Sequence, residues 1–448
     1  MIQFPLGLHT PVEHSAALPQ SADAVVIGGG VVGVSTAIYL RRRGVNVVLI
    51  EKGRVAAEQS SRNWGWIRQQ GRDPAELPIM MEARPLWKEL AAASGEDFGL
   101  VEAGVTYIAR DDSELAGFEK WLDSVKSSGV DSRILDAKET AALIPGMSTH
   151  YPGALTTPTD MRAEPWLAVP ALARLAAREG VTIIENCAAR ALDTQGGRVA
   201  GLFTAAGRIA VSEVVLAAGA WSSLFLRRHG VTIPQLSVLA TAAATEPLPE
   251  VHAGAATNEE VSFRRRMDGG YTLADGGSHD FFIGPDAFRA LPKYIPVLKE
   301  HMTDTRLKPW APSGYPDAWG TPRKWREDEE TPFERMRVLN PKPLAKTRDN
   351  FVSQFEKLFP QLGQVKVKAT WAGMIDTLPD VVPVIDRTAT IKGLTIGTGM
   401  CGHGFGIGPG VGRVLADMVT GNTIGHDLSR FRLDRFSSGK AMDPGPAL

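Results

Sequence analysis

The sequence predicts an α/β fold of two domains, and three observations support this prediction. The first is a strand, glycine turn, helix and second strand that follow one another without interruption over residues 24–51. The second is the length of 448 residues, which exceeds what one ordinary core accommodates. The third is a shift in composition between residues 231 and 364 toward Pro, Arg, Trp and mixed charge, which marks the second domain.

The composition is that of an ordinary globular protein, with 44% hydrophobic residues, 22% charged residues and a net charge of -1. This balance gives no support to nucleic-acid binding. Cys187 and Cys401 form neither a C-x-x-C motif nor a zinc spacing, which favours a reduced intracellular chain. Segment 1–21 lacks the features of a signal peptide and is expected to be a tail or lid strand. No apolar run approaches the roughly 18 residues of a spanning helix. We therefore expect a cytoplasmic protein, with a peripheral position at the inner membrane as the alternative.

The first unit carries a dinucleotide-binding motif. Gly28, Gly30 and Gly33 give G-x-G-x-x-G directly after the apolar strand. The first glycine permits the tight turn, the second lets a pyrophosphate approach the backbone, and the third lets the helix pack closely on the sheet. The helix begins near Val31 and Val32, so its N-terminal amides and dipole face the phosphates. This pattern predicts a phosphate-binding turn.

The second strand of this unit, Val45 to Ile50, ends in Glu51, 18 residues after Gly33. An acid at this position accepts hydrogen bonds from both hydroxyls of an adenosine ribose and repels a 2′-phosphate. With the strand, the helix and the terminal Glu in register, the unit predicts dinucleotide binding. By itself the unit does not distinguish FAD from NAD.

An irregular segment over residues 52–73 leaves the second strand close to the expected cofactor. It is dense in Ser, Gly, Trp, Gln and Arg. The alternative is a solvated loop whose tryptophans fill a seam between domains. Candidate donors to a phosphate or a flavin ring edge are Ser60, Ser61, Arg62 and Asn63. Candidate residues of a substrate pocket are Trp64, Trp66, Arg68, Gln69 and Gln70.

Hydrophobic periodicity predicts the following elements. Helices are expected within 76–94, over 113–128 with Ser113 as its cap, and over 164–178. Strands are expected at 100–109, at 153–160 where the chain resumes the first domain, at 181–185, and in a hairpin over 198–211 that turns at 206–207. The run VVLAAGAWS then places Ala218 and Gly219 at the end of a strand, with Trp221 behind them. These small residues let backbone approach the cofactor, with a simple strand-to-helix turn as the alternative.

The second domain offers a candidate anion ligand. Residues 261–275 predict a hairpin that turns at 268–270, with Arg264 and Arg266 on one face and Arg265 on the other. One arginine facing a pocket holds a carboxylate with two hydrogen bonds, and Arg264 is the preferred candidate. The alternative is that these arginines lie on a solvent-exposed face of the strand.

An aromatic, Pro-rich insert over 281–325 follows, with a helix expected at 287–302. It is interpreted as a lid, a dimer contact or a patch resting on a membrane. The charge run at 321–337 is predicted to be solvated surface.

The C-terminal part supplies a second cofactor motif. Strands are expected at 369–375 and 393–397, followed by seven glycines within 397–410 and a helix entered near Pro409. Such a backbone suits a large planar ring, with helix amides aimed at its electron-rich edge, where they stabilise an anionic reduced flavin. His403 is expected to orient the loop and contact the ring, with proton transfer as the alternative. Phe405 is expected to contact the ring.

With these motifs in place, the chain resembles the D-amino-acid oxidase superfamily of FAD enzymes, which also holds sarcosine and glycine oxidases. The matching motifs are GGGVVG, the terminal Glu51, LAAGAWS and GMCGHGFGIGPG with its helix, in family order. The segments EKGRVAAEQSSR, NCAARALDTQGG and ETPFERMR look most like the bacterial L-amino-acid deaminases. Those enzymes oxidise an amino acid to its imino acid, which water hydrolyses to a 2-oxo acid and ammonia.

The resemblance implies a Rossmann-like FAD-binding domain at 1–95, 150–230 and 365–448, interleaved with an antiparallel-sheet substrate domain at 96–149 and 231–364. By position, the residues expected at the adenine half and the phosphates are Gly28, Gly30, Gly33, Glu51, Lys52, Ser61, Arg62, Ala189 and Gly219. The residues expected at the isoalloxazine are Gly402, His403, Gly404, Phe405 and Gly406. Further expected cofactor contacts are Val31, Val32, Ser60, Asn63, Trp64, Gly65, Ala218, Trp221, Gly373 and Ile407.

Three departures from the family pattern affect the expected substrate and acceptor. The deaminases carry a membrane-anchoring N-terminus that is not matched here. Their glutamine after the SSR-x-x-G motif corresponds to Trp66, and a proline-arginine pair corresponds roughly to Asp275-Gly276, so an arginine for the substrate carboxylate is missing there. Sarcosine oxidases attach FAD through a cysteine that falls near Gly373, so FAD is expected to bind non-covalently.

The resemblance and the motifs together predict oxidative deamination of an amino acid or related amine, by hydride transfer from the α carbon to flavin N5 and hydrolysis of the imine. Arg68 or Arg264 is expected to hold the substrate anion, with Trp64 and Trp66 as pocket walls. The electron acceptor is oxygen or a quinone or other carrier, and a homo-oligomer stays open. The alternatives are oxidation of a secondary or N-methylated amine, a quinone-linked hydroxy-acid dehydrogenase, and a non-catalytic FAD-binding subunit.

Overall fold

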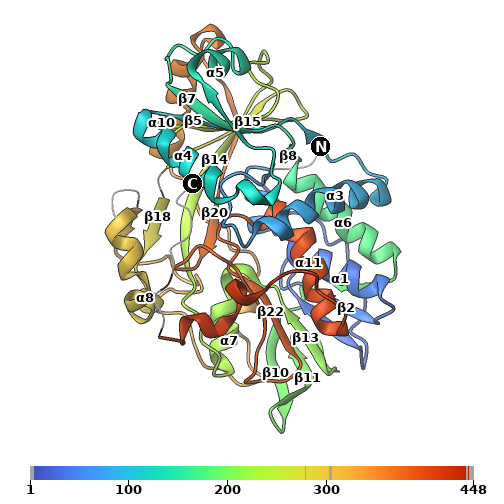
Figure 1. Cartoon of the computed structure of the whole chain (residues 1–448). Helices are drawn as coiled ribbons and strands as arrows, with labels where there is room; N and C mark the ends of the chain where they lie inside the picture. Colours follow the sequence, from blue (N-terminus) through green and yellow to red (C-terminus); the bar gives the residue numbers. More distant parts are fainter. Residues whose placement is uncertain (1–4, 278, 302–304, 440–441, 443–448) are drawn as a thin grey trace.

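The chain forms two large sheets with their covering helices (Figure 1). The computed structural model describes residues 5–277, 279–301, 305–439 and 442. In Figure 1 the parallel sheet with α1 and α11 lies in the lower part, and β5, β7 and β15 of the second sheet lie in the upper part. Strands β14 and β20 run between the two.

The first sheet has six strands in the order β21-β22-β13-β1-β2-β9. Strand β1 pairs in parallel with β13 on one side and β2 on the other, so the strand order reverses at β1. Ligands of such sheets bind at the carboxyl ends of the strands beside this reversal. Only β21 is antiparallel. The strands are β1 (Ala24–Ile27), β2 (Val47–Ile50), β9 (Thr182–Ile184), β13 (Glu213–Leu216), β21 (Val384–Arg387) and β22 (Leu394–Thr398).

Four helices cover one face of this sheet and share one hydrophobic core with it. They are α1 (Val31–Arg42), α3 (Leu77–Ser94), α6 (Pro165–Arg178) and α11 (Gly404–Thr420). The predicted helices at 76–94 and 164–178 are confirmed. The C-terminal helix begins at Gly404, five residues before the predicted entry near Pro409, so most of the glycine-rich stretch is helix.

The other face of the parallel sheet is covered by a small antiparallel sheet and a short helix. The hairpin expected over 198–211 is present, whereas its third strand, β10, was not predicted. The elements are β10 (Ala189–Gln195), β11 (Arg198–Thr204), β12 (Gly207–Ala210) and α7 (Ser222–Arg228).

The second sheet has ten strands, with two parallel pairs, β15 with β5 and β18 with β19, among antiparallel ones. Two of its strands correct the sequence analysis. Strands β7 and β20 were expected in the first domain, but β7 pairs with β5 and β6, and β20 pairs with β14 along its whole length. Boundaries at 150 and 365 therefore cut this sheet. The strands are β5 (Val105–Ala109), β6 (Arg133–Asp136), β7 (Gly153–Thr157), β14 (Leu236–Thr245), β15 (Ala255–Thr257), β16 (Ser262–Arg265), β17 (Tyr271–Ala274), β18 (His279–Phe282), β19 (Thr305–Lys308) and β20 (Val367–Thr377).

A three-stranded sheet links the loop after β2 to the second sheet. It consists of β3 (Trp66–Ile67), β8 (Met161–Arg162) and β4 (Val101–Glu102). The strand expected over 100–109 is divided into β4 and β5, because Gly104 takes a positive φ of 77° between them. Segment 52–73 was predicted to be irregular, but it contains β3 and the short helix α2 (Gln59–Arg62).

Of the remaining helices, α4, α5, α8 and α10 contact the second sheet, whereas α9 packs against α7 and β10 of the first domain. Helix α4 is capped by Asp111, which accepts a hydrogen bond from the Glu114 amide, and not by Ser113 as predicted. The predicted helix of the insert is confirmed as α8, and its predicted end at Met302 lies outside the described residues. The charge run at 321–337 is only partly surface, because Phe333 is buried and Glu334 pairs with Arg190. The helices are α4 (Asp112–Ser124), α5 (Ala137–Leu143), α8 (Pro285–His301), α9 (Pro332–Arg335) and α10 (Ala345–Leu358).

Candidate functional site

The glycine turn after β1 has the close packing that its motif predicts. Gly28 has a φ of 111°, and a Cβ on it would lie 2.4 Å from the Ala217 carbonyl oxygen. A Cβ on Gly33 would lie 2.0 Å from the Gly28 oxygen. Gly30 differs, because the nearest atom to its Cβ position is the Ser60 hydroxyl at 3.0 Å and its φ is -78°. Gly28 and Gly33 are thus needed by the fold itself, and Gly30 leaves space for a ligand.

Glu51 lies partly buried in contact with this turn. One carboxylate oxygen accepts a hydrogen bond from the Gly29 amide at 2.8 Å and the other accepts one from the Gly53 amide at 2.7 Å. Burial raises the pKa of Glu51, against the effect of Lys52 and the two amides. A carboxylate has about four acceptor sites, so two hydrogen bonds leave capacity for two ribose hydroxyls.

Of the polar residues after Glu51, Ser60 and Asn63 form hydrogen bonds within the protein, whereas the Ser61 hydroxyl has no partner among the described residues. The Ser60 hydroxyl accepts a hydrogen bond from the Val31 amide at 2.9 Å. The Ser61 hydroxyl is buried and has no hydrogen-bond partner among the described residues, which suits a donor to a bound group. Asn63 is engaged, since it donates to the Gln59 and Ser60 carbonyls and accepts from the Gly65 amide.

Arg62 does not suit the predicted cofactor role. Its guanidinium is buried and donates to three carbonyls and one side-chain amide: those of Ala57, Ala372, Leu6 and Asn340. Burial lowers its pKa to about 10. Arg62 therefore ties the loop to β20 and to the N-terminal segment. Trp371 strengthens the same joint by donating to the Arg62 carbonyl at 2.8 Å.

Lys52 and Trp221 are also engaged within the protein. The Lys52 ammonium lies 2.5 Å from a Glu58 oxygen and 4.3 Å from the centre of the Trp221 ring. The Trp221 indole donates to Glu58 at 3.0 Å. Lys52 and Trp221, which were predicted to contact the cofactor, thus both pack against Glu58. This packing orders the side of the candidate site that they form.

A buried polar network behind Gly219 was missed by sequence reasoning. The Gln235 amide donates to the Gly219 carbonyl at 3.2 Å and to Asp376 at 2.9 Å, and Asp376 also accepts from the Gly399 amide at 2.9 Å. It joins the ends of β13, β20 and β22. Single polar residues within strands gave no signal for it. Ala218 and Gly219 are adjacent to the Gly28 turn, Ala189 begins β10, and Gly373 faces Arg62.

The glycine-rich stretch at the C-terminus serves helix packing more than the predicted flat loop. A Cβ on Gly408 would lie 2.7 Å from Val31, and one on Gly412 would lie 2.5 Å from Ser35. Gly410 packs against α3 in the same manner. Gly408 and Gly412 are four residues apart and lie on the face of α11 toward α1, whereas Gly410 lies on the adjacent face toward α3. Because these positions carry no side chain, α11 lies close to both helices.

The start of α11 still points to a ligand. His403 is its N-cap, and the first amides, those of Gly404 to Gly406, have no partner within the helix. Gly402 has a φ of 80° at the preceding turn. Phe405 corrects a prediction, because it is buried against Trp87 with ring centres 5.0 Å apart. Ile407 is fully buried and belongs to the core.

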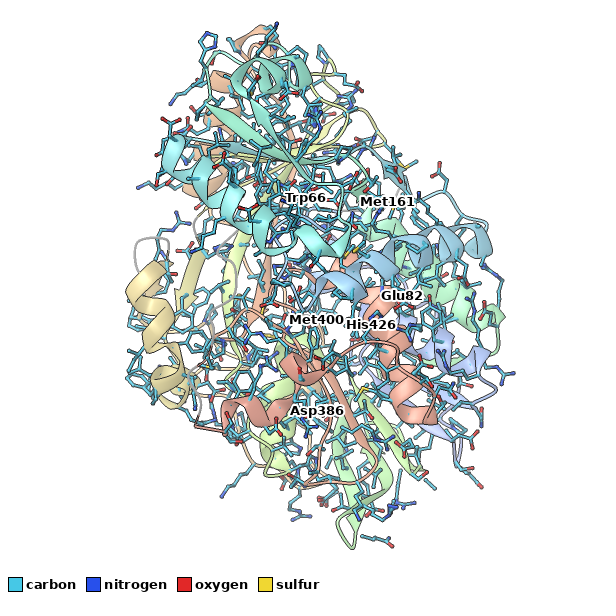
Figure 2. All side chains as sticks on the ribbon, in the orientation of Figure 1. Trp66, Glu82, Met161, Asp386, Met400 and His426 are labelled. Carbon is cyan, nitrogen blue, oxygen red and sulfur yellow. The ribbon has the colours of Figure 1, made fainter. Side chains whose placement is uncertain are left out.

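A buried polar cluster lies beside this helix start. The Glu76 carboxylate, wholly buried before α3, lies 3.4 Å from His403 Nδ1 and 3.9 Å from Arg72 Nη1. We call these residues, together with Trp66, Arg68 and Gln70, the Glu76 cluster. In Figure 2 Trp66 lies where the upper and lower parts meet, and its ring packs against residues of β5 and α4. Arg68 extends the cluster over the Tyr107 ring at 5.4 Å.

Burial dominates the electrostatics of the cluster. It raises the pKa of Glu76 to about 7, although Arg72 and Arg68 oppose this shift. It lowers the pKa of Arg72 to about 9. Burial and the two arginines hold the pKa of His403 well below its usual range, so this imidazole stays neutral. Such shifts are typical of functional sites.

The two candidate arginines have different environments. Arg264 is wholly buried and forms two hydrogen bonds with Glu164, at 3.0 and 2.9 Å, so it is not available to a substrate. Arg68 is partly exposed, donates to the Gln70 carbonyl, and has no acidic partner within ion-pair distance among the described residues. Trp64 and Trp66 pack edge to face beside them, with ring centres 5.3 Å apart. The prediction for Arg264 is wrong, and Arg68 stays the candidate.

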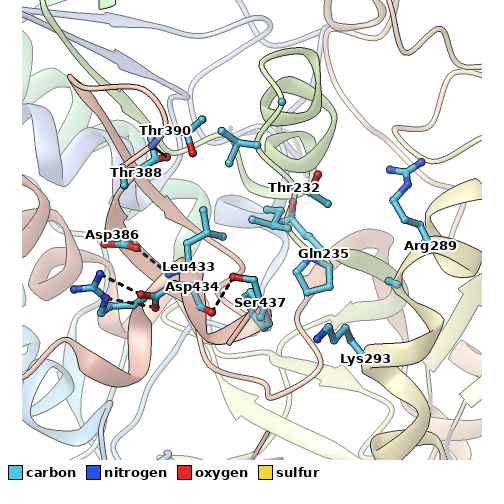
Figure 3. Close-up of a pocket in the computed structure, with 18 of the residues that line it drawn as sticks. Thr232, Gln235, Arg289, Lys293, Asp386, Thr388, Thr390, Leu433, Asp434 and Ser437 are labelled. Carbon is cyan, nitrogen blue, oxygen red and sulfur yellow. Dashed lines mark hydrogen bonds and ion pairs between the residues drawn. The ribbon is translucent and has the colours of Figure 1, made fainter. Parts of the chain in front are cut away.

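A separate open cavity of about 470 Å³ lies between the 230–235 segment, α8, the end of β21 and the 432–437 segment (Figure 3). Lys293 and Arg289 of α8 face it from one side. On the other side Asp386 accepts from the Leu433 amide at 2.9 Å. Its lining shares no residue with the glycine turn or the Glu76 cluster.

No helix within residues 5–277, 279–301 and 305–439 is long and apolar enough to cross a membrane. The same part of the chain holds no group of three His, Cys, Asp or Glu side chains suited to a metal ion.

The parallel sheet, the glycine turn with Glu51, and the helix start at His403 define a dinucleotide-binding oxidoreductase. The family model DAO, FAD dependent oxidoreductase, matches residues 23–418, so the chain belongs to this family. Its FAD dependence confirms the predicted cofactor, and Glu51, the unpartnered Ser61 hydroxyl and the space at Gly30 fit FAD.

The chain is similar to known members along nearly its whole length. It is 26% identical to sarcosine oxidase subunit beta of Arthrobacter sp, covering 95% of this chain and 93% of that one. L-amino acid deaminase from Proteus myxofaciens, solved in complex with anthranilate, superimposes with a TM-score of 0.91 at 29% identity, covering 96% and 97%. L-proline dehydrogenase from P. horikoshii shares the fold, with a TM-score of 0.77 at 24% identity, covering 94% and 100%.

Proposed function

We propose that this protein catalyses the FAD-dependent oxidative deamination of an amino acid or a related amine. FAD, when bound, supplies the chemistry by accepting a hydride from the substrate α carbon, and the resulting imine hydrolyses in water. The observation that carries the proposal is the Glu76 cluster, in which six buried polar atoms have no hydrogen-bond partner among the described residues, beside the helix start at His403. Family membership and the similarity to the amino acid deaminase support it.

The protein's own residues bind and orient the substrate in this proposal. Arg68 holds the substrate anion, and Trp64 and Trp66 form apolar walls that exclude water. His403, whose pKa burial and the two arginines hold well below its usual range, orients the start of α11 as a neutral imidazole. FAD is proposed to bind non-covalently, because Gly373 provides no side chain for attachment.

Anaerobic mixing of the FAD-bound protein with a panel of amino acids and amines tests the proposal. We expect at least one amino acid to bleach the visible absorption of oxidised flavin. Readmission of oxygen then distinguishes the acceptors, since peroxide forms with an oxidase, whereas a quinone or other electron carrier is required otherwise. If no amine bleaches the flavin, the proposal is wrong. Bleaching by a hydroxy acid in that case indicates a hydroxy-acid dehydrogenase.

A second candidate is oxidation of a secondary or N-methylated amine. It is favoured by the similarity to sarcosine oxidase subunit beta over 95% of the chain. Release of formaldehyde from an N-methyl amino acid, in step with flavin reduction, identifies this activity. Release of ammonia from a primary amino acid identifies the first.

The proposed setting is cytoplasmic, with the insert at 281–325 as a contact surface. Phe288, Trp310 and Trp319 are 61%, 67% and 58% exposed, and such aromatic side chains suit a membrane surface or a second copy of the chain. Flotation with anionic vesicles and light scattering without them distinguish these two contacts.

A further inference from the structure

Six buried polar atoms of the Glu76 cluster have no hydrogen-bond partner among the described residues. They are Trp66 Nε1, Gln70 Nε2, Arg72 Nη1, both carboxylate oxygens of Glu76 and His403 Nδ1. Leaving one such group without a hydrogen bond costs about 1–3 kcal/mol. Several of them side by side therefore indicate a site that binds a polar ligand. The chain supplies these atoms from β3, from the loop that follows it, from the start of α3 and from the start of α11.

The charges of this cluster favour an anion. Arg72 and Glu76 lie 3.9 Å apart, too far for a hydrogen bond, and both are buried. The groups that act on Glu76 are Arg72, Arg68, Asp380 and Arg430, together with the imidazole of His403 and the carboxylate of Asp73. Asp380 is held by Arg435 at 2.7 Å and Asp73 by Arg430 at 3.3 Å. Asp160 also acts on Arg68 and Arg72, but its carboxylate accepts hydrogen bonds from the Gln69 and Gln70 amides at 2.7 and 3.4 Å. Among the described residues, Glu76 is the acid beside these arginines whose two carboxylate oxygens have no hydrogen-bond partner.

We propose that Arg68 and Arg72 together bind the substrate carboxylate, and that Glu76 accepts the proton which the substrate ammonium group loses on binding. This inference rests on the proposed function and assigns roles to Arg72 and Glu76 that the sequence did not indicate. The aromatic walls formed by Trp64 and Trp66 close the site on its apolar side.

The proton transfer balances without another reactant. The N–H bond of the substrate ammonium breaks, the O–H bond of Glu76 forms, and the nitrogen keeps the electron pair. The substrate becomes a neutral amine with its carboxylate intact, and Glu76 becomes a neutral acid. No oxidation or reduction occurs in this step. The carboxylate of the substrate replaces Glu76 as the counter-charge of Arg72, which is why Glu76 is the group that becomes neutral.

The position of Glu76 beside Arg72 and the raised pKa of Glu76 predict the same pH dependence of carboxylate binding. Because the pKa of Glu76 is about 7, this acid is ionised above that pH and competes with an incoming carboxylate for Arg72. A carboxylate ligand that brings no ammonium group must therefore take one proton from solvent above pH 7. An amino acid brings that proton itself.

Benzoate is a suitable probe, because it has a carboxylate, no ammonium group and a flat apolar ring. The FAD-bound protein is titrated with benzoate, and binding is followed by the flavin spectrum and by calorimetry in buffers of different ionisation enthalpy. In the wild type we expect benzoate affinity to fall about tenfold per pH unit above pH 7, with uptake of about one proton per benzoate.

Two substitutions make the comparison specific. Glu76→Gln removes the proton acceptor, so benzoate binding should become independent of pH between about 7 and 8, below the Arg72 pKa of about 9, and take up no proton. Glu82→Gln is the matched control, because Glu82 lies on the same helix, pairs with Arg413 and His426 outside the cluster, and should behave as the wild type (Figure 2). If Glu76→Gln does not fold, Glu76→Asp retains a titrating acid and should keep the proton uptake, whereas Arg72→Met should lose it along with affinity.

The inference is overturned if benzoate binds with equal pH dependence in the wild type and in Glu76→Gln, or if it leaves the wild-type flavin spectrum unchanged at every pH. Its failure is separable from failure of the proposed function. Proton uptake with benzoate requires no turnover, so it can be present in a protein that no amine reduces. Flavin reduction by an amino acid with no benzoate effect upholds the function and rejects this site.

Discussion

Arg264 and Glu164 form a fully buried ion pair that joins β16 of the second sheet to the start of α6. Both guanidinium Nη atoms donate to the carboxylate, and the Met267 amide donates to the same carboxylate at 2.8 Å. Arg264 also donates to the Trp64 carbonyl and, within the second sheet, to the Arg265 carbonyl and the Thr272 hydroxyl, so its polar atoms are occupied and a structural role follows.

Arg264→Met should destabilise the protein strongly, because it leaves the Glu164 charge buried without its partner. We expect a loss of about 3–5 kcal/mol in the free energy of unfolding, measured by urea denaturation of the FAD-bound protein. Arg265→Met is the control, because Arg265 points to the other face and lies 3.7 Å from the exposed Glu250. Its loss should stay below about 1 kcal/mol. A stable Arg264→Met variant with a raised KM would instead indicate a substrate ligand.

Gly412→Ala should separate the packing role of the C-terminal glycines from a cofactor role. Its new Cβ would lie 2.5 Å from Ser35 of α1, so the helices must move apart. We expect a loss of about 1–3 kcal/mol in unfolding free energy, as for other overpacked cores.

The matched control is Gly117→Ala, in the middle of α4, where an added Cβ meets no atom within 4 Å. There the change should stabilise the protein by up to about 1 kcal/mol, because alanine favours helix. Equal effects at the two positions would show that close contact of α11 with α1 does not matter.

The elements that were predicted correctly from the sequence are those fixed by local interactions. The unit at 24–51 holds its strand, turn, helix and acid within 28 consecutive residues. By contrast, β7 and β20 were found as strands but placed in the wrong sheet. An alternating or apolar strand does not identify its partner, and β20 pairs with residues more than 120 positions away.

The start of α11 shows how packing overrides local preference. Five glycines and Pro409 within the first nine residues disfavour a helix in isolation, so a later start was predicted. Contact with α1 and α3 requires those glycines and stabilises the helix. Likewise Arg68 and Arg264 looked equivalent as anion ligands, and only the fold shows that Glu164, 100 positions away, neutralises one of them. Glu76 gave no signal, because an acid before a helix is ordinary.

Gly30→Ala and Gly33→Ala should have different consequences although both alter the same motif. At Gly33 the new Cβ would lie 2.0 Å from a carbonyl oxygen within the turn itself, so we expect a loss of at least about 3 kcal/mol with or without FAD. At Gly30 only the Ser60 hydroxyl is close, and the backbone suits alanine. That variant should fold normally and bind FAD about tenfold or more weakly. Circular dichroism and FAD titration measure the two effects, and normal FAD affinity in Gly30→Ala would contradict the predicted approach of the pyrophosphate.

His229 should make the protein less stable in acid. Its Nε2 accepts a hydrogen bond from the Leu192 amide at 3.1 Å, which requires a neutral ring, and burial lowers its pKa to about 4. Because the unfolded chain binds the proton more tightly, with a pKa near 6.5, stability is retained above about pH 6.5 and is lost as the pH falls toward 4. His229→Gln keeps an acceptor that does not titrate, so urea midpoints should depend less on pH across this range. The decline is reduced and not removed, since burial also lowers the pKa of His252. His150→Gln, at an exposed position, should follow the wild type, and an unchanged slope in His229→Gln would show that this hydrogen bond does not control the acid response.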